Sequence, residues 1–225
     1  SSSAPVKFVS ISTGEHHSCA ITPGGEGVRN LKCWGRANNG QLGIEFNSFI
    51  GPDCDGRMYY GVIPRSLAPS TVCLPTYNFG ALGGTSVVAV ATGAAHTCAL
   101  TDVGLVKCWG NNWYGQLGLM SGGPDGRLSP SQSHIANEDG YVWLGGEEDD
   151  WDYVGNIIAV DISAGAYHTC ATLVDDSVKC WGRNDKGQLG DGTICSVYTQ
   201  ASPTDRGCNG RGGKDHPSLV DLPTD

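Results

Sequence analysis

The stretch KCWGNNWYGQLG, residues 107–118, has two near copies in the same chain: KCWGRANNGQLG at 32–43 and KCWGRNDKGQLG at 179–190. The likeness extends backwards through the motif G-x-x-H-[ST]-C-A, which begins at Gly14, Gly93 and Gly165. An internal repeat of this kind predicts similar units stacked side by side, because one small unit cannot bury its own apolar surface. The repeat therefore governs the interpretation of the fold.

Each copy has the alternation of β-strands rather than the spacing of helices. In the second copy the short β-rich runs VVAVAT (87–92), HTCALT (96–101) and LVKCWG (105–110) are separated by Gly or Asp turns. We therefore expect each copy to be a small antiparallel meander, whose second and third runs form a hairpin.

The cysteines test the register of this hairpin. Cys98 and Cys108 are ten residues apart, as are Cys170 and Cys180. Folding each hairpin about its midpoint places the two cysteines directly opposite, close enough for a bridge in a non-hydrogen-bonded pair. Cys19 and Cys33 are four residues further apart, and an even insertion leaves every side chain on its original face. We predict one disulfide in each copy.

Four cysteines remain, all in segments that follow a GQLG. They permit three pairings, of which we favour the local pairs Cys54 with Cys73 and Cys195 with Cys208. Each bridge would fix a long insert that has too little apolar content to order itself by packing.

Composition supports an all-β protein of an oxidising compartment. The 225 residues include 34 Gly and 11 Pro, and only 16% are charged, whereas long helices need many charged residues and alanines. Ten Cys without C-x-x-C or zinc-site spacing indicate a disulfide framework, so we expect a secreted, extracellular or cell-surface protein. The net charge of -9 argues against a nucleic-acid partner, and no apolar run is long enough for a membrane span.

The two motifs together resemble the repeat of the regulator of chromosome condensation family, and the paired cysteines resemble a secreted branch of such repeats. The resemblance covers the core of all three copies, about half the chain. It implies a β-propeller, in which each blade is a four-stranded antiparallel sheet. Independently of the family, each repeated Trp needs a partner for its indole N–H. The Gln of GQLG has an amide that could satisfy backbone groups between adjacent units.

We therefore expect a partial β-propeller of three four-stranded antiparallel blades with long disulfide-stapled loop inserts. One propeller-type domain would cover 1–225, with repeats at approximately 6–85, 86–156 and 157–225. A closed propeller needs four to eight blades. Three blades indicate that other protein subunits, or the remainder of its own chain, complete the structure.

The repeated histidines, His17, His96 and His168, allow two interpretations. They could serve metal binding or catalysis, but each lies in a different unit, which favours a structural hydrogen-bonding role. The sequence also lacks a nucleophile elbow, a zinc-protease motif and a phosphate loop. We expect no enzyme, no catalytic or metal-binding residues and no cofactor. The acidic run at 145–155 lacks the spacing of a calcium loop and favours a solvated loop over a Ca²⁺ site.

Aromatic residues outside the repeated positions are the candidate binding residues. Their side chains suit sugar stacking or protein hot spots, or they pack the inserts against the blades. They are Tyr59, Tyr60, Trp113, Tyr114, Trp143, Trp151 and Tyr153. The first functional hypothesis is a non-enzymatic extracellular structural or protein-interaction module that assembles through blades and decorated loops. The alternatives are a lectin-like binder of glycans and an inhibitor of a secreted enzyme.

Overall fold

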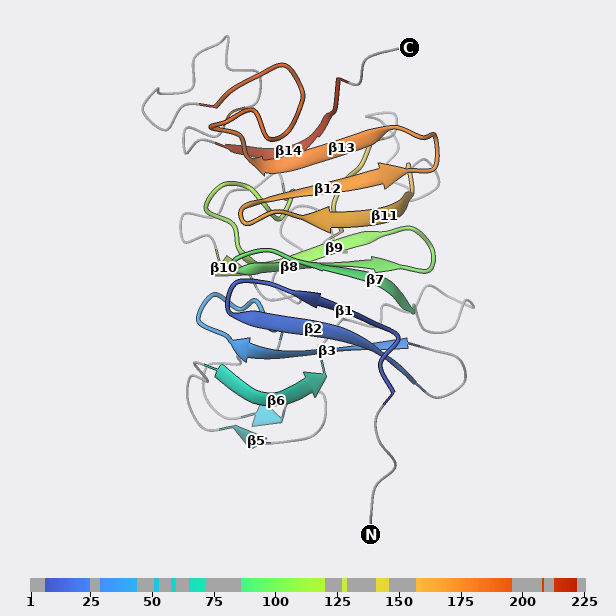
Figure 1. Ribbon diagram of the computed structural model, residues 1–225, viewed down its shortest axis with the longest axis vertical. Coiled ribbons are helices and arrows are strands. Elements are labelled where there is room, and N and C mark those ends of the chain that lie inside the picture. Colours follow the sequence, from blue (N-terminus) through green and yellow to red (C-terminus); the bar gives the residue numbers. More distant parts are fainter. Residues whose placement is uncertain are drawn as a thin grey trace.

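Three antiparallel sheets, one for each repeat, stack in chain order (Figure 1). The computed structural model describes residues 7–24, 29–43, 51–52, 58–59, 65–71, 86–119, 127–128, 141–145, 157–195, 208 and 213–221. For 51–52, 58–59, 65–71, 127–128 and His216, only the backbone is described. All regular structure in these ranges is β-strand.

Each sheet has four strands, as expected for a propeller blade. Three come from the repeat itself and the fourth from the segment that follows it. Blade 1 contains β1 (Ser10–Thr13), β2 (His17–Pro23), β3 (Arg29–Arg36) and β6 (Arg65–Thr71). Blade 2 contains β7 (Val87–Thr92), β8 (His96–Thr101), β9 (Val106–Asn111) and β10 (Arg127–Leu128). Blade 3 contains β11 (Ala159–Ala164), β12 (His168–Leu173), β13 (Val178–Arg183) and β14 (Gly213–Leu219). In the first insert β4 (Gly51–Pro52) pairs with β5 (Met58–Tyr59).

The hairpin register is the one that the cysteine spacing predicts. Cys19 lies opposite Cys33, and the pairs Cys98 with Cys108 and Cys170 with Cys180 repeat the arrangement. All three pairs are bridged, with Cα atoms 4.1 Å apart.

The fourth described bridge joins Cys195 to Cys208 across a separation of 13 residues, which confirms the predicted local pairing. Cys54 and Cys73 lie outside the described residues, so their pairing stays a prediction.

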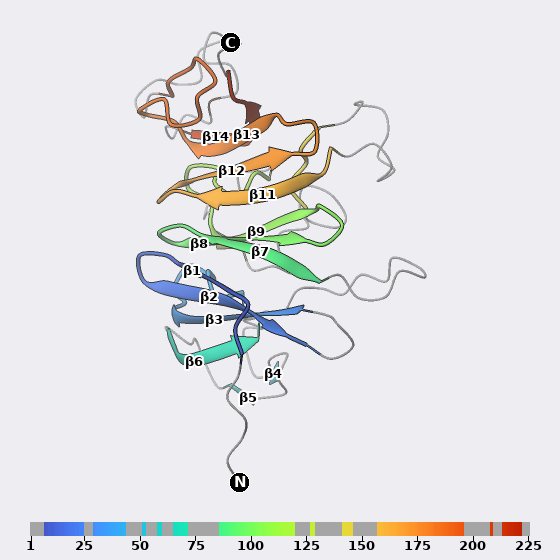
Figure 2. The ribbon, with the colours of Figure 1, turned by 45° about the vertical axis from the view of Figure 1, so that its right-hand side comes forward.

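The apolar core lies between the blades. β7 packs against β1, β2 and β3 of blade 1, and β11 packs against β7 and β8. The core between blades 1 and 2 places Trp109 with Leu42, and the core between blades 2 and 3 places Trp181 with Leu117. In each case the Trp of one repeat therefore belongs to the same buried cluster as the GQLG leucine of the repeat before it. Figure 2 shows the resulting stack of sheets from a second direction.

Candidate protein-binding surfaces

A network of hydrogen bonds crosses the interface between blades 1 and 2. The backbone carbonyl of Gln41 accepts the indole N–H of Trp109 at 3.1 Å and the hydroxyl of Thr97 at 2.8 Å. The Thr97 oxygen in turn lies 2.8 Å from Nε2 of His17. All four residues are buried, so this network satisfies polar groups that water cannot reach.

The same arrangement recurs one blade later. Trp181 and Thr169 donate to the carbonyl of Gln116, each at 3.0 Å, and Thr169 lies 3.0 Å from Nε2 of His96. His17 and His96 thus have the structural hydrogen-bonding role that the sequence favoured. The role expected of the GQLG glutamine differs in detail. Its backbone carbonyl acts between blades, whereas its side-chain oxygen accepts an N–H within its own loop, as Gln41 does from Asn39 at 2.9 Å.

The glycine of G-x-x-H makes room for this network. A Cβ at Gly93 would lie 2.1 Å from Cε1 of His96 and 2.7 Å from the carbonyl oxygen of Gly165. A Cβ at Gly14 would lie 2.2 Å from the carbonyl oxygen of Gly93. Only a residue without a side chain allows the histidine ring and the neighbouring blade to approach this closely.

The outward face of blade 1 exposes positions that are buried in the other two blades. Ile11 is 62% exposed, whereas Val90 and Ile162, which occupy the same register in blades 2 and 3, are 9% and 8% exposed. Trp34 is only partly buried, and its ring packs against that of Phe8. Within the described ranges its indole N–H meets no glutamine carbonyl. This face, with Ile11, Ser18 and Trp34, is called the front end face.

The outward face of blade 3 also leaves uncovered side chains whose counterparts in blades 1 and 2 are buried. His168 and Cys170 are only partly buried, although their counterparts in blades 1 and 2 are fully buried. Exposed Thr172 stands where blades 1 and 2 have the buried Ile21 and Leu100. In the part of the chain that is described, the carbonyl of Gln188 receives no Trp or Thr donor. This face, with His168, Thr172 and Gln188, is called the rear end face.

A third surface is formed by loops at one end of all three blades, on the left in Figure 1. In each blade the G-x-x-H turn is held to the end of the third strand by a backbone hydrogen bond. These bonds run from Arg36 to His16, from Asn111 to Ala95 and from Arg183 to Tyr167, at 2.8–2.9 Å. Each blade therefore presents one side chain from its turn beside one from its strand. We call this surface the loop face.

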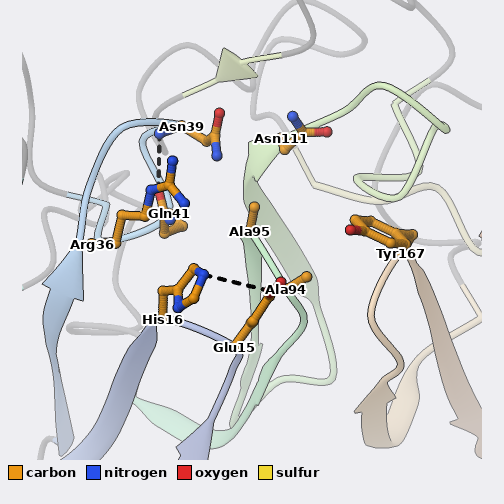
Figure 3. Close-up of a pocket in the computed structure, with 9 residues that line it drawn as sticks. All are labelled: Glu15, His16, Arg36, Asn39, Gln41, Ala94, Ala95, Asn111 and Tyr167. Atoms are coloured by element: carbon orange, nitrogen blue, oxygen red, sulfur yellow. Dashed lines mark hydrogen bonds and ion pairs between the residues drawn. The ribbon is translucent and has the colours of Figure 1, made fainter.

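The loop face contains a pocket of about 330 Å³ between blades 1 and 2 (Figure 3). Its polar lining comes mainly from Arg36, His16, Asn39, Gln41, Asn111 and Tyr167, and Ala94 and Ala95 contribute small side chains. Glu15 also lines it, and Oε1 of Glu15 lies 3.4 Å from Nε2 of His16. The amide Nε2 of Gln41 is buried and has no hydrogen-bond partner among the described residues.

Beside the pocket, blade 3 contributes an arginine that packs against two neighbouring aromatic rings. The guanidinium of Arg183 lies 5.1 Å from the ring centre of Tyr114 and 5.6 Å from that of Tyr167, within the range of cation–π contacts. Its Nε and Nη2 donate to the two oxygens of Asp185 at 2.7 and 2.8 Å. These hydrogen bonds lower the pKa of Asp185 to about 2.

The predicted binding residues are only partly brought together. Trp113 and Tyr114 both lie in the blade 2 loop of this face, where Trp113 is 49% exposed and Tyr114 contacts Tyr167. Trp143 is 39% exposed, but its segment runs beside the start of β9, away from the loop face. The side chain of Tyr59 and all of Tyr60, Trp151 and Tyr153 lie outside what the structure describes.

Four residues of this surface were not predicted from the sequence as binding residues, namely Arg36, Gln41, Tyr167 and Arg183, although the Gln41 amide was expected to act between adjacent units. Tyr167 gave a signal, because it stands where the other copies have His16 and Ala95. Arg36 and Arg183 recur at one position, with Asn111 in the copy between them. Differences within an exact alignment of the repeats could have pointed to these positions.

The described part of the chain contains no group of three or more His, Cys, Asp or Glu side chains that could hold a metal ion. Within the same ranges there is no helix long and apolar enough to cross a membrane. Nearly all of the acidic run at 145–155 lies outside the described ranges.

Comparison with known sequences identifies the repeats. Residues 8–41, 87–116 and 159–188 match the regulator of chromosome condensation (RCC1) repeat. The chain is 29% identical to the ultraviolet-B receptor UVR8 of Arabidopsis thaliana, over 89% of this chain and 48% of the receptor. It is also 29% identical to the mouse secretion-regulating guanine nucleotide exchange factor, over 83% of this chain and 33% of that protein. The chain thus spans less than half the length of either relative.

Solved structures show the same fold. Human WBSCR16 superposes with a TM-score of 0.62 at 21% identity, over 96% of this chain and 42% of that one. Prp20p of Saccharomyces cerevisiae, a protein studied for its binding to Gsp1p and histones, superposes with a TM-score of 0.59 at 18% identity. That match covers 98% of this chain and 40% of Prp20p.

Proposed function

Because the chain is built from three repeats of the RCC1 family, we propose that it is a non-enzymatic, extracellular protein-interaction module that assembles through its two end faces. The partner at each face is a further blade, from another subunit or from the remainder of its own polypeptide. On this proposal 1–225 acts as one propeller-type domain with repeats at approximately 6–85, 86–156 and 157–225.

One observation carries the proposal: Ile11 is 62% exposed at a position where Val90 and Ile162 are 9% and 8% exposed. At the two inner interfaces the preceding blade covers this position. Exposed apolar surface on a blade face favours association, since burying it removes apolar area from water.

The polar groups of the end faces complement one another. The front end face has Trp34 and Ser18 at the positions of the donors Trp109 and Thr97. The rear end face has Gln188 and His168 at the positions of Gln41 and His17. A rear face placed against a front face would therefore form the same hydrogen-bond network as the inner interfaces. Such contact is head-to-tail, which gives rings when the rotation closes and open stacks when it does not.

Two further observations support the extracellular location and the binding of other proteins. Four described disulfides suit an oxidising compartment. Prp20p, which has this fold, is a protein whose binding to other proteins has been studied. The exchange and receptor activities named for the relatives belong to proteins more than twice as long as the matched segment.

Sedimentation equilibrium of the purified protein tests the proposal. We expect concentration-dependent species heavier than the monomer, whose mass is 23.5 kDa. Ile11→Glu should shift the population to monomer, because a carboxylate would then be buried at the contact. Val103→Glu is the matched control, since Val103 is also exposed but lies in the β8–β9 turn. A monomer at every concentration, or equal effects of the two variants, would contradict the proposal.

Carbohydrate binding is a second candidate, favoured by the half-exposed ring of Trp113 on the loop face. Exposed Trp rings stack on sugar faces through their large apolar area. A glycan array with the wild-type protein and with Trp113→Ala checks it. A glycan signal that Trp113→Ala removes would support the lectin hypothesis. The absence of binding to any glycan on the array at high protein concentration would contradict it.

A further inference from the structure

We propose that the pocket of the loop face binds a carboxylate group of a partner molecule, between the guanidinium of Arg36 and the side-chain amide of Gln41. Both residues line the pocket (Figure 3). This surface is distinct from the two end faces, so the proposal goes beyond the assembly described above and stands or fails separately from it.

The first argument is the unpaired amide of Gln41. The side chain is fully buried, and its oxygen accepts the N–H of Asn39 at 2.9 Å, which fixes the amide orientation. Its Nε2 has no hydrogen-bond partner in the described part of the chain. Buried amide donors are normally paired. An oxygen acceptor from another molecule would give Nε2 of Gln41 its missing hydrogen-bond partner.

The second argument comes from the equivalent glutamines of the other blades. Nε2 of Gln116 donates to Oδ1 of Asn111 at 3.0 Å, and Nε2 of Gln188 donates to Oδ1 of Asp185 at 3.3 Å. In both blades the amide therefore donates to a side-chain oxygen near the end of the third strand. Asn111 is the last residue of β9, and Asp185 lies two residues after the end of β13. Blade 1 has Arg36 and Asn38 at these positions, and neither accepts a bond from Gln41 Nε2.

The third argument is that blade 3 contains the complete site. There Arg183 donates to both oxygens of Asp185 at 2.7 and 2.8 Å, while Gln188 donates to the same carboxylate. Arg36 and Gln41 occupy the positions of Arg183 and Gln188 in blade 1. The position of Asp185 is Asn38 in blade 1. Blade 1 thus keeps both partners of a carboxylate but lacks the carboxylate itself.

The remaining lining adds hydrogen-bond donors. Oδ1 of Asn111 accepts from Gln116 Nε2 and from the N–H of Trp113, which orients the NH₂ group of Asn111 as a donor for a ligand. The side chain of Tyr167 lies across the pocket from Arg36 (Figure 3). Glu15 is the acidic residue in the lining, and its carboxylate lies 3.4 Å from Nε2 of His16. A carboxylate from an Asp or Glu side chain, or from the C-terminus of a peptide, has the geometry for bidentate contact with Arg36.

The test uses NMR of the ¹⁵N-labelled protein with three small probes. N-acetyl-glycyl-glycine carries a terminal carboxylate, and N-acetyl-glycyl-glutamate amide carries a side-chain carboxylate. N-acetyl-glycyl-glutamine amide is the neutral control. We expect at least one acid to shift the side-chain amide signals of Gln41, with a dissociation constant on the order of 1–10 mM. Which acid binds more tightly distinguishes a C-terminus from an acidic side chain.

Two variants separate binding from folding. Arg36→Gln should weaken binding by about tenfold or more, because the charged bidentate contact is lost. Asn38→Asp should abolish it, because the new carboxylate would occupy the site at an effective concentration that the probe cannot match. Arg29→Gln is the matched control, since it removes an exposed arginine at the opposite end of β3 from Arg36, and it should leave probe binding unchanged. Dispersed backbone spectra show that each variant is folded.

The proposal is overturned if neither acid moves the Gln41 amide signals, or if the neutral control moves them equally. It is also overturned if folded Asn38→Asp binds the acids as tightly as the wild type. Since the end-face variant Ile11→Glu can be titrated in the same way, failure of this site is distinguishable from failure of the assembly.

Discussion

The hydroxyl of Thr97 in blade 2 accepts a hydrogen bond from Nε2 of His17 in blade 1, with 2.8 Å between the two atoms. The direction follows because the Thr97 hydrogen is donated to the carbonyl of Gln41. Nε2 of His17 therefore carries a proton. Burial lowers its pKa to about 4, and burial together with the neighbouring histidines lowers that of His96 to about 3.

These two histidines predict a loss of stability in mild acid. The unfolded chain protonates them near pH 6.5, whereas the folded protein keeps them neutral. Their contribution is complete above about pH 6.5 and is lost as the pH falls, down to about 4 for His17 and about 3 for His96. Each lowers the free energy of unfolding by about 1.4 kcal/mol per pH unit in that window. Urea denaturation at several pH values above the range where carboxylates titrate measures the slope, and a flat profile there would refute the assignment.

Thr97→Val tests the hydrogen-bond network itself. The change keeps the shape of the side chain but leaves the N–H of His17 and the carbonyl of Gln41 each short of a partner. We expect the free energy of unfolding to fall by about 1–3 kcal/mol. Ser18→Val is the control, because Ser18 occupies the same position on the front end face, where the monomer has no such network among the described residues. Both variants are measured in the Ile11→Glu background, which is expected to keep the protein monomeric. Equal losses in the two variants would show that the network adds nothing to stability.

The glycine of KCWG should tolerate no side chain. Gly182 has φ of 101°, and a Cβ there would lie 2.6 Å from the carbonyl oxygen of Tyr167. Gly192 has φ of 72°, but a Cβ there meets nothing within 4 Å. We expect Gly192→Ala to cost about 1 kcal/mol, the conformational penalty alone. Gly182→Ala should cost clearly more, as judged by denaturation midpoints, and a similar loss at both sites would argue against the steric explanation.

The bridge between Cys54 and Cys73 remains to be observed. Mass spectrometry of the protein digested without reduction should yield one peptide pair that contains these two cysteines, besides the pairs for the four described bridges. A peptide that joins Cys54 or Cys73 to any other cysteine would contradict the local pairing.

The sequence was sufficient for features that are local to one repeat. Cys98 and Cys108 could be placed opposite each other because a hairpin register depends only on spacing along the polypeptide. The need of Trp109 for a hydrogen-bond partner was also predictable. The partner itself, the carbonyl of Gln41, was not, because 68 residues separate the two and only the stacking of the blades brings them together.

The pocket was hidden for the same reason. It joins turns of different blades, so that Tyr167 and Arg36, far apart in the sequence, line one cavity. Trp113 and Tyr114 were found because they break the repeat, whereas Arg36 is matched by Arg183 and differs only from Asn111 of the second copy, which is a weaker signal. The role of Arg36 becomes visible only by comparison with Arg183, which donates hydrogen bonds to both oxygens of Asp185. Blade 1 has no carboxylate at the position of Asp185.

The position of each hairpin disulfide also determines when it can form and whether a reductant can reach it. Each closes a span of only 10 or 14 residues between opposed strands of one blade, so it can form before any neighbouring blade exists. Oxidation can therefore proceed unit by unit from the N-terminus during synthesis. The accessibility of the bridges to a reductant depends instead on the stacking of the blades. Cys19 and Cys98 are buried under the next blade, whereas Cys170 lies on the rear end face and is only partly buried. A reductant that spares the first two bridges would reach the third, unless a partner covers it.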